Sequence, residues 1–363
     1  MPSEVSPPAR PRQGGSDSES TSIRNTVSAK RCAVSLSPER LVKTGFLEGG
    51  SGLPLVVEPC VQGVDPVAWA SSQRELIDAK LQEHGGILFR NFSVTTPVEF
   101  ERFIVSVSGD LLEYRYRSTP RSRVSGNVYT STEYPAGEHI PLHNEMSYTT
   151  SWPMKIAFFC AQPANEGGET PIADSRRVFA RIDPRIREQF TRKQVMYARN
   201  YGERLDLPWQ DVFQTTDKAE VEAYCRRASI DFEWRGSDGL RTRQVCQATA
   251  THPRTGEKVW FNQAHLFHTS NLKPEVRHSL LAACREEDLP RNAYFGDGSH
   301  IEDSLVDEIR DAYRQETVSF SWERFDIVLL DNMLAAHGRT PFAGHRKILA
   351  AMAESHGAAG VEG

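Results

Sequence analysis

Apolar residues form short runs in the first and last parts of the chain. In the middle part they recur mainly at helical spacing. Short apolar or β-branched runs bounded by turn residues are typical of strands. We therefore predict strands at 54–58, 86–90, 114–117, 127–130, 154–160, 169–174, 259–262, 317–320, 326–330 and 347–352. The clearest turn between two of them is Gly167-Gly168, just before the strand at 169–174.

Helices are predicted where apolar residues recur at i, i+3 and i+4. Leu76, Ala79 and Leu81 lie on helical spacing in a segment that Gly85-Gly86 ends, and a Thr cap followed by a proline opens the next helix. The predicted helices are 68–84, 96–106, 273–285 and one that follows a capping box at 299–302.

The order of these elements predicts a mainly β fold that also contains helices. Strands lie before and after a segment, about 176–316, in which helical signals dominate. That order fits a distorted jelly roll of two packed sheets better than a doubly wound parallel sheet, for which the chain has neither a GxGxxG nor a GxxxxGK[ST] motif. We expect one domain at 36–363 with a helical insert, preceded by a disordered tail at 1–35 that is rich in Ser, Pro and Arg.

Composition excludes several classes of protein. A chain of 363 residues, 39% apolar and 25% charged, is typical of a globular protein, and its net charge of -5 gives no reason to expect nucleic acid or an anionic membrane as a partner. No apolar run approaches the roughly 20 residues that span a bilayer, and no signal-peptide core is found near the start, so we expect a cytoplasmic protein. The six cysteines lack CxxC spacing, which favours buried thiols over a disulfide scaffold or a zinc knuckle.

A histidine and a carboxylate close in sequence, His143 and Glu145, are the first candidates for chemistry. In an extended segment the side chains at i and i+2 point to the same face, so both could bind one metal ion. The best third ligand is His337, delivered by the apolar strand at 326–330. Two histidines and one carboxylate on one side of an iron ion form the facial triad of non-haem Fe(II) oxygenases.

Further motifs extend this set. The motifs are His143-Asn144-Glu145, Gly167-Gly168-Glu169-Thr170-Pro171, Asp331-Asn332, His337-Gly338-Arg339 and Arg346. Together they resemble the Fe(II)/2-oxoglutarate dioxygenases of the TauD/TfdA, or clavaminate synthase-like, family. The resemblance covers roughly residues 50 to 355, and within it 116–174 and 337–342 are most similar to the SyrP-like branch found in natural-product pathways.

This resemblance implies a double-stranded β-helix, cupin-like core in which His143, Glu145 and His337 bind iron and 2-oxoglutarate chelates the same iron. It also implies that the Thr170 hydroxyl and the Arg346 guanidinium hold the distal carboxylate of 2-oxoglutarate. Such enzymes use O2 to convert 2-oxoglutarate to succinate and CO2 and to oxidise an unactivated C–H bond of the substrate. Because position 145 is neither Ala nor Gly, the resemblance argues against a halogenase.

Each candidate also has a simpler interpretation. An isolated HxE sequence is more often part of a surface strand or turn, and only its combination with the other motifs favours a metal site. Thr170 could be an ordinary β-branched strand residue. Arg346 could be a surface cation, and Arg339 competes with it for the same carboxylate or for the substrate. Two histidines and a glutamate also suit catalytic zinc, so a zinc hydrolase stays open, as does a scaffold protein without turnover.

Other polar residues near these motifs are weaker candidates. His265 and His268 could line the pocket, but histidines among apolar residues are more often core residues with satisfied hydrogen bonds. Four arginines before the iron motif are more often a solvated strand face, although one of them could bind an anionic substrate. These arginines are Arg115, Arg117, Arg121 and Arg123.

We therefore predict an Fe(II)/2-oxoglutarate-dependent dioxygenase that hydroxylates an aliphatic carbon. The SyrP-like resemblance implies an amino acid or amino-acid-derived substrate, free or tethered to a carrier protein, in natural-product biosynthesis. Desaturation and cyclisation stay open as other outcomes with the same cofactor set. The expected partners are a small-molecule substrate, O2 and that carrier, with neither nucleic acid nor a membrane.

Overall fold

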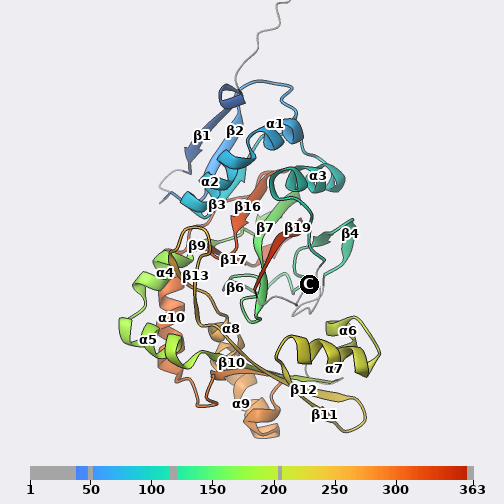
Figure 1. Cartoon of the computed structure of the whole chain (residues 1–363), viewed down its shortest axis with the longest axis vertical. Coiled ribbons are helices and arrows are strands. Elements are labelled where there is room, and N and C mark those ends of the chain that lie inside the picture. The colour runs from blue at the N-terminus through green and yellow to red at the C-terminus, as the bar shows by residue number, and fades with distance from the viewer. Residues whose placement is uncertain (1–37, 48–51, 114–120, 203–206, 358–363) are drawn as a thin grey trace, which may run out of the picture. The chain divides into compact units, whose positions relative to one another are not determined.

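The computed structural model describes four stretches of the chain, 38–47, 52–113, 121–202 and 207–357. The predicted tail at 1–35 and the predicted strand at 114–117 therefore lie outside the described residues. Residues Ser37–Gly363 form one compact unit. It begins with the 3-10 helix η1 (Pro38–Leu41). Its core consists of two sheets (Figure 1), and their strands come from the chain before and after about residues 175–316.

The larger sheet has a fully buried centre. Its strands are β1 (Val42–Phe46), β2 (Leu55–Pro59), β3 (Gly86–Phe89), β4 (Arg123–Ser125), β5 (Val128–Thr130), β7 (Ser151–Gln162), β16 (Ile327–Asp331) and β19 (Lys347–Gly357). Within the described residues they are hydrogen-bonded in the order β1-β2-β3-β16-β7-β19-β5-β4, parallel between β2 and β3 and otherwise antiparallel. Central strands covered on both faces require continuous apolar runs, which is why the sequence predicted them well.

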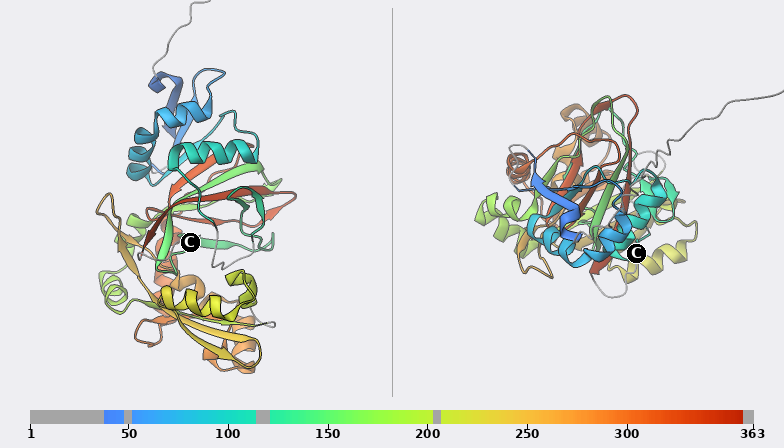
Figure 2. Two further views of the ribbon diagram at one scale, coloured as in Figure 1. Left: turned by 45° about the vertical axis from the view of Figure 1, so that its right-hand side comes forward. Right: turned by 90° about the horizontal axis from the view of Figure 1, so that it is seen from above.

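Successive residues of β16 face two different apolar clusters. Ile327 and Leu329 pack with the cluster under the N-terminal helices, whereas Val328 and Leu330 pack with the cluster on the other face. The covering helices are α1 (Pro66–Ser72), α2 (Arg74–His84) and α3 (Pro97–Ser108), and Figure 2 shows them on one side of the sheet. The Thr cap of α3 is confirmed, because Thr96 and Glu99 form a capping box.

The smaller sheet joins strands from distant parts of the chain. It consists of β6 (Ile140–His143), β17 (Ala335–Arg339) and β9 (Ile172–Asp174), in the order β6-β17-β9, and a short pair, β8 (Glu166–Gly167) with β18 (Phe342–Ala343), lies nearby in sequence. The chain passes from the larger sheet at β16 to the smaller sheet at β17. Two sheets linked in this way form the predicted double-stranded β-helix, or distorted jelly roll.

The predicted helix at 68–84 is two helices. Gln73 ends α1 and begins α2, and its backbone N–H donates to the carbonyl oxygens of Trp69 and Ala70. The break lets Trp69 pack on Phe89 while α2 buries Leu81. Helical spacing alone did not reveal this change of direction.

The segment at about 176–316 is not simply a helical insert. Its helices are α4 (Ser175–Arg181), α5 (Pro184–Lys193), α6 (Trp209–Phe213), α7 (Lys218–Arg227), α8 (Ala264–Phe267), η2 (Thr269–Asn271), α9 (Pro274–Ala283), η3 (Glu286–Asp288) and α10 (Asp303–Glu316). Its strands are β10 (Val195–Tyr201), β11 (Asp231–Arg235), β12 (Gly239–Cys246), β13 (Thr249–Thr251), β14 (Lys258–Trp260) and β15 (Arg291–Phe295). Four of these strands form an antiparallel sheet in the order β11-β12-β10-β15. The segment is therefore a mixture of helices and a sheet, and the expectation of a helical insert was wrong for these four strands.

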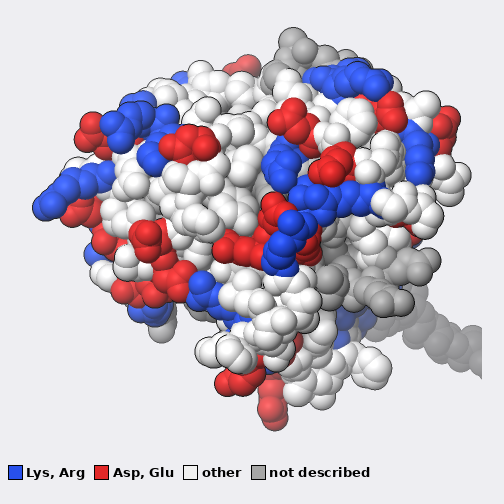
Figure 3. All heavy atoms as spheres, turned by 90° about the horizontal axis from the view of Figure 1, so that it is seen from below, with Lys and Arg blue, Asp and Glu red and all other residues white. Residues whose placement is uncertain are grey.

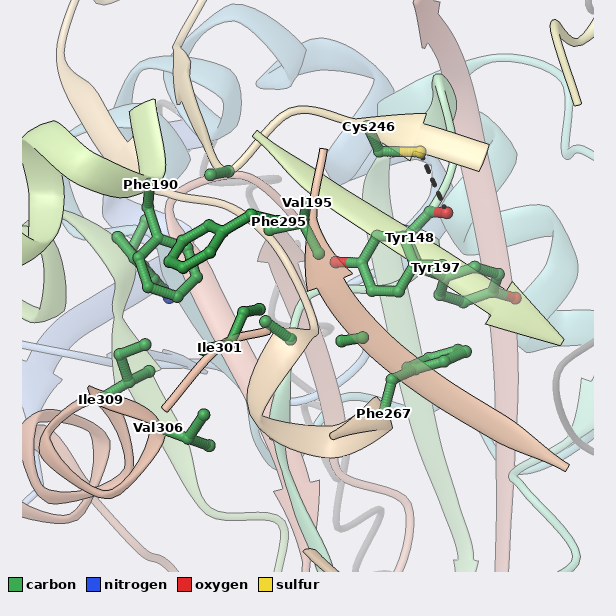
Figure 4. Close-up of a cluster of buried hydrophobic side chains, with 14 of the residues drawn as sticks. Tyr148, Phe190, Val195, Tyr197, Cys246, Phe267, Phe295, Ile301, Val306 and Ile309 are labelled. Carbon is green, nitrogen blue, oxygen red and sulfur yellow. Dashed lines mark hydrogen bonds between the residues drawn. The ribbon is translucent and has the colours of Figure 1, made fainter. Parts of the chain in front are cut away.

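A separate apolar cluster stabilises this insert (Figure 4). Phe190 of α5 packs against Phe295 of β15 with ring centroids 5.1 Å apart. Tyr197 of β10 packs edge to face on Phe267 of α8 at 4.9 Å. Helices and sheet therefore share one core, which also includes Tyr148, a residue of the segment that carries the candidate ligands.

Two further predictions about the later part of the chain were wrong. Helix α10 begins at Asp303, and its N-cap Glu302 makes no side-chain cap hydrogen bond, so the sequence at 299–302 is not a capping box. The segment at 317–320 is not a strand, because Val318 makes only an isolated bridge, to Ile172. Both patterns are short, and tertiary packing outweighs such local preferences.

The surface and the cysteines agree with composition in most respects. Figure 3 shows acidic and basic side chains interspersed on one face of the molecule. Across the described ranges, no helix is long and apolar enough to cross a membrane. Cys160, Cys225 and Cys246 are buried thiols as expected, but Cys60 is exposed.

Candidate active site

The three predicted metal ligands lie together where β6 meets β17. His143 ends β6, and the strand register pairs it directly with His337 on β17. Nε2 of His337 lies 3.9 Å from Oε2 of Glu145. One ligand atom from each of the three residues lies within 4.8 Å of the others, a spacing compatible with one ion bound by all three.

A backbone contact fixes the orientation of His143. Its Nδ1 lies 2.9 Å from the carbonyl oxygen of Pro141. A carbonyl oxygen can only accept, so Nδ1 carries the proton and the lone pair is on Nε2. The ring therefore presents an unprotonated nitrogen for a metal ion.

Glu145 reaches the site from a turn and not from an extended strand. Strand β6 ends at His143, and the turn that follows contains Met146 at a φ of 57°. Asn332 holds this turn, because its Oδ1 accepts from the backbone N–H of Glu145 at 2.7 Å and its Nδ2 donates to the backbone oxygen of Glu145 at 2.9 Å. The expected i and i+2 geometry was wrong, although both residues do face one site.

His337 belongs to its own strand and not to the apolar strand before it. Asp331, the last residue of β16, accepts from the backbone N–H groups of Met333 and Leu334 and so closes a tight turn into β17. The next residue, Gly338, lies so close to β6 that a Cβ there would be 2.6 Å from the carbonyl oxygen of Ile140. A side chain at that position would push apart the two strands that bring the histidines together.

The environment keeps both imidazoles neutral. Burial lowers the pKa of His143, opposed in part by the nearby Glu145 carboxylate. Burial also holds the pKa of His337 well below its usual value, helped by His143 and by the positive charge of Arg121. Neutral imidazole is the form that binds metal, so no proton has to be displaced from either ring near neutral pH.

A small, partly open pocket connects the histidines with the predicted cosubstrate residues. His143, His337, Thr170 and Arg346 all line it, and Phe158 forms an apolar wall. Within this pocket two of the three metal candidates and both carboxylate candidates are therefore neighbours, and Glu145 adjoins them beside His337.

Thr170 is not a strand residue, because the strand predicted at 169–174 begins only at Ile172, and its hydroxyl has a defined partner. Thr170 is buried, and the indole N–H of Trp322 donates to its Oγ1 at 3.0 Å. A hydroxyl oxygen that accepts this bond still has a hydrogen to donate. The Thr170 hydroxyl can therefore donate to an anion in the pocket.

Arg346 and Arg339, which sequence alone left as competitors, have different surroundings. Arg339 donates to the carbonyl oxygens of Tyr134, Pro135 and Glu138 and so holds the loop before β6. Arg346 donates from Nε to the carbonyl oxygen of Gly168 at 2.9 Å, and its terminal nitrogens make no hydrogen bond to the described residues. Burial lowers the pKa of Arg346 to about 10, so it is still a cation at neutral pH. Of the two guanidiniums, that of Arg346 is available to a bound carboxylate.

One of the four arginines before the iron motif is part of the site. Arg121 is buried, lines the pocket and donates from Nη2 to Oε2 of Glu145 at 2.7 Å. The interpretation of these arginines as a solvated face was wrong for Arg121 but holds for Arg123, which is exposed and donates to Asn127. Arg115 and Arg117 lie outside the described residues.

The insert supports the ligand segment from behind. His265 donates from Nε2 to the carbonyl oxygen of Leu142 at 2.8 Å, and Gln263 donates to that of Asn144 at 2.8 Å. Burial lowers the pKa of His265 to about 3, so this ring is also neutral. His265 is thus a core histidine, as expected, but only its Nε2 has a hydrogen-bond partner within the described residues. His268 contacts Ser270.

Sequence reasoning did not find the roles of four residues around this site. Arg121 had no signal that set it apart from neighbouring arginines. Asn332 was noticed only as part of a motif, and its polar side chain directly after a buried strand was the available clue. Trp322 and His252 had no signal, although His252 bonds Asp331 at 3.0 Å and so supports the turn into β17.

The residues present fit an iron centre. Two neutral imidazoles and one carboxylate leave several coordination positions open, as a metal that must also bind a keto acid and dioxygen requires. The same ligands also suit zinc. Thr170 and Arg346 favour the oxygenase, because a hydrolase has no need of a carboxylate site beside its metal.

Comparison with known proteins gives an independent result. The chain is 44% identical over 276 residues to the dapdiamide synthesis protein DdaC of Enterobacter agglomerans, covering 76% of this chain and 84% of that protein. It is 30% identical over 292 residues to a clavaminate synthase-like protein of Arabidopsis thaliana, covering 77% of this chain and 85% of that one.

Solved structures agree on the fold. The PvcB protein of Pseudomonas aeruginosa, which is described as an Fe, alpha-ketoglutarate dependent oxygenase from an isonitrile synthetic pathway, superposes with a TM-score of 0.52 at 17% identity over 88% of this chain and 93% of that one. The family model described as taurine catabolism dioxygenase TauD, TfdA family matches residues 52–352. The chain therefore belongs to the TauD/TfdA family and is a non-haem iron dioxygenase that uses Fe(II) and 2-oxoglutarate.

Proposed function

We propose that this dioxygenase hydroxylates an aliphatic carbon of an amino acid or amino-acid-derived substrate, free or tethered to a carrier protein, in natural-product biosynthesis. The similarity to DdaC, whose name refers to dapdiamide synthesis, supports the substrate class. The observation that carries the proposal is that two imidazoles, a carboxylate, a hydroxyl and an arginine line or adjoin one pocket.

His143, Glu145 and His337 are the proposed iron ligands, and Thr170 and Arg346 are the proposed anchors of the distal carboxylate of 2-oxoglutarate. The iron and 2-oxoglutarate supply the oxidation of the C–H bond with O2, releasing succinate and CO2. The protein side chains position the iron, 2-oxoglutarate and the substrate relative to one another.

Each side chain has a separate task in this proposal. His143 presents Nε2 because Pro141 holds its other nitrogen. Arg346 offers a cation and Thr170 a hydroxyl hydrogen, so together they would hold the far carboxylate of 2-oxoglutarate and leave its keto acid end for the metal. Phe158, beside His337 with ring centroids 4.9 Å apart, provides an apolar wall there.

We also propose that residues 36–363 act as a single dioxygenase domain. The support is that insert residues hydrogen-bond the ligand segment, as His265 does at Leu142. An insert that holds the metal ligands is part of the catalytic unit.

The first test is an anaerobic titration with Fe(II) and 2-oxoglutarate, which follows the weak visible band of the keto acid bound to the metal. We expect the band with the natural sequence, loss of the band in His143→Ala, and a need for much more 2-oxoglutarate in Arg346→Ala. Lys347→Ala, an exposed neighbour, is the matched control and is expected to titrate normally. A natural protein that binds metal but gives no band contradicts the assigned residues.

The second test concerns the substrate. Succinate release is measured with free amino acids and with the same amino acids loaded on a carrier protein, and the products are examined by mass spectrometry. A product that gains one oxygen atom supports hydroxylation. Loss of two hydrogen atoms indicates desaturation or cyclisation, and turnover only with substrates unrelated to amino acids contradicts the substrate class.

A further inference from the structure

The Glu145 carboxylate contacts a second buried charge. Arg121 donates from Nη2 to Oε2 of Glu145 at 2.7 Å, and only 3% and 4% of the two side chains are exposed. The same Oε2 is the oxygen that lies 3.9 Å from Nε2 of His337. Arg121 therefore binds the very oxygen that faces the other candidate ligands.

Burial gives this ion pair a strict geometry. Removing a carboxylate and a guanidinium from water is costly, and the cost is offset only where the two groups stay in close, well-directed contact. Thr132 adds a weaker contact, because Nη2 of Arg121 lies 3.4 Å from its Oγ1. The guanidinium is consequently held in place by more than the carboxylate alone.

Glu145 is thus fixed at both ends. Asn332 binds its backbone N–H and carbonyl oxygen, and Arg121 binds its carboxylate. A glutamate has three rotatable side-chain bonds, and contacts to its backbone do not fix them. The contact from Arg121 restricts where the carboxylate lies.

We propose that Arg121 is a positioning residue that holds the Glu145 carboxylate ready for iron. The inference rests on the proposed role of Glu145 as an iron ligand. Contacts that orient metal ligands typically change metal affinity by about 10- to 100-fold when they are removed. The positive charge also balances Glu145 before metal arrives, so a buried carboxylate is not left without a counter-charge.

This role differs from that of a substrate arginine, which sequence analysis had left open for this group. A substrate arginine would leave metal binding unchanged and would weaken binding of the substrate. A positioning arginine would weaken metal binding and leave the binding of 2-oxoglutarate to metal-saturated protein nearly unchanged. The two roles therefore separate in direct binding measurements that need no turnover.

The test is a titration of the full chain with Co(II), whose visible absorption reports on the ligands of the metal, followed by 2-oxoglutarate titration at saturating metal. The variants are Arg121→Met, which removes the contact, and Arg121→Lys, which keeps a cation able to reach the carboxylate. Arg123→Met is the matched control, because Arg123 is a nearby but exposed arginine. Thermal unfolding checks that each variant folds.

We expect Arg121→Met to bind Co(II) about 10- to 100-fold more weakly with an altered absorption band, and Arg121→Lys to recover most of the affinity. Arg123→Met is expected to match the natural sequence. Arg346→Ala gives the reverse pattern, with normal metal affinity and weaker 2-oxoglutarate binding. If Arg121→Met does not fold, Arg121→Gln tests the charge alone, because its amide can still donate to the carboxylate, and we expect it to bind Co(II) more weakly than Arg121→Lys does.

Unchanged metal affinity and an unchanged band in a folded Arg121 variant overturn the inference. If the same variant instead loses affinity for substrate, the arginine belongs to substrate binding. Failure of the proposed iron site is a separate result, because it is seen as absence of metal binding in the natural sequence and not as a difference between variants.

Discussion

Strands β16 and β17 follow one another in the chain, and all five residues of each are buried, yet β16 is mostly large and apolar whereas β17 combines small with polar residues. Strand β16 presents Ile327, Val328, Leu329 and Leu330 to two apolar clusters. Strand β17 buries His337, Gly338 and Arg339 in the smaller sheet. The same degree of burial therefore serves packing in one strand and the active site in the other.

The difference teaches that burial by itself does not identify a core strand. Apolar side chains gain free energy by leaving water, whereas a buried polar group must find a partner or lose free energy. Arg339 finds three carbonyl oxygens, and His337 faces Glu145 and His143. Substitutions in β16 should therefore affect stability first, and substitutions in β17 should affect metal binding first.

The largest expected effect is that of His337→Ala, which should abolish tight metal binding and turnover because one of three ligands is lost. Stability should change much less than metal affinity. Metal binding by equilibrium dialysis and unfolding in denaturant measure the two properties, with the exposed His278→Ala as the control. Normal metal affinity in His337→Ala would remove His337 from the site.

The opposite behaviour is expected of Leu329→Ala in β16. Leu329 is fully buried, so its truncation should cost about 2–5 kcal/mol of the free energy of unfolding through lost burial and a cavity. Metal affinity of the folded protein should stay within a fewfold of normal. Leu76→Ala, at a leucine that is 46% exposed, should cost far less. A large loss of metal affinity in folded Leu329→Ala would break the contrast between the strands.

The turn between the strands should show both effects. Asn332→Ala leaves the backbone N–H of Glu145 without its acceptor and removes donations to Glu145 and Pro153. We expect roughly 1–3 kcal/mol lower stability and a metal affinity lowered by about tenfold or more. Asn332→Asp keeps the acceptor but places a carboxylate oxygen against the carbonyl oxygens of Glu145 and Pro153, so it should be no more stable than Asn332→Ala. Stability close to that of the natural sequence in Asn332→Asp would contradict the assigned hydrogen bonds.

The smallest expected effect concerns Trp322→Phe, which removes the N–H that donates to Thr170 but keeps an aromatic ring. We expect 2-oxoglutarate affinity to fall about fivefold, as for loss of one hydrogen bond worth about 1 kcal/mol, with metal affinity unchanged. Titration of the visible band gives both values. If Thr170→Val lowers the affinity but Trp322→Phe does not, the indole has no part in orienting the hydroxyl.

Sequence patterns predicted the central strands because those strands are buried on both faces and so need continuous apolar runs, as at 154–160 and 326–330. The insert sheet was missed for the opposite reason. Its strand β10 mixes Arg199 and Asn200 with apolar residues, so neither alternation nor a continuous run marks it. Helical signals around it then dominated the prediction.

The candidate site was predictable where local motifs define residue types. His143, Glu145, His337, Thr170 and Arg346 were all chosen from sequence, and the structure brings them to or beside one pocket. Residue types and their spacing along the chain do not depend on folding, so a sequence motif is enough to identify these residues. Which of Arg339 and Arg346 is available to a carboxylate was not predictable, because it depends on which loop carbonyls lie nearby.

The sequence by itself determined which segments must be buried and which residue types could bind a metal, since both follow from side-chain chemistry. Only the tertiary structure decided which residues contact Glu145. Asn332, 187 residues away, accepts from its backbone N–H, and Arg121, among several arginines, donates to its carboxylate. The physical reason is that hydrophobic burial depends on area and has no direction, whereas hydrogen bonds and ion pairs require a distance and an angle. Those are set by strand register and turn geometry, which exist only in the folded chain.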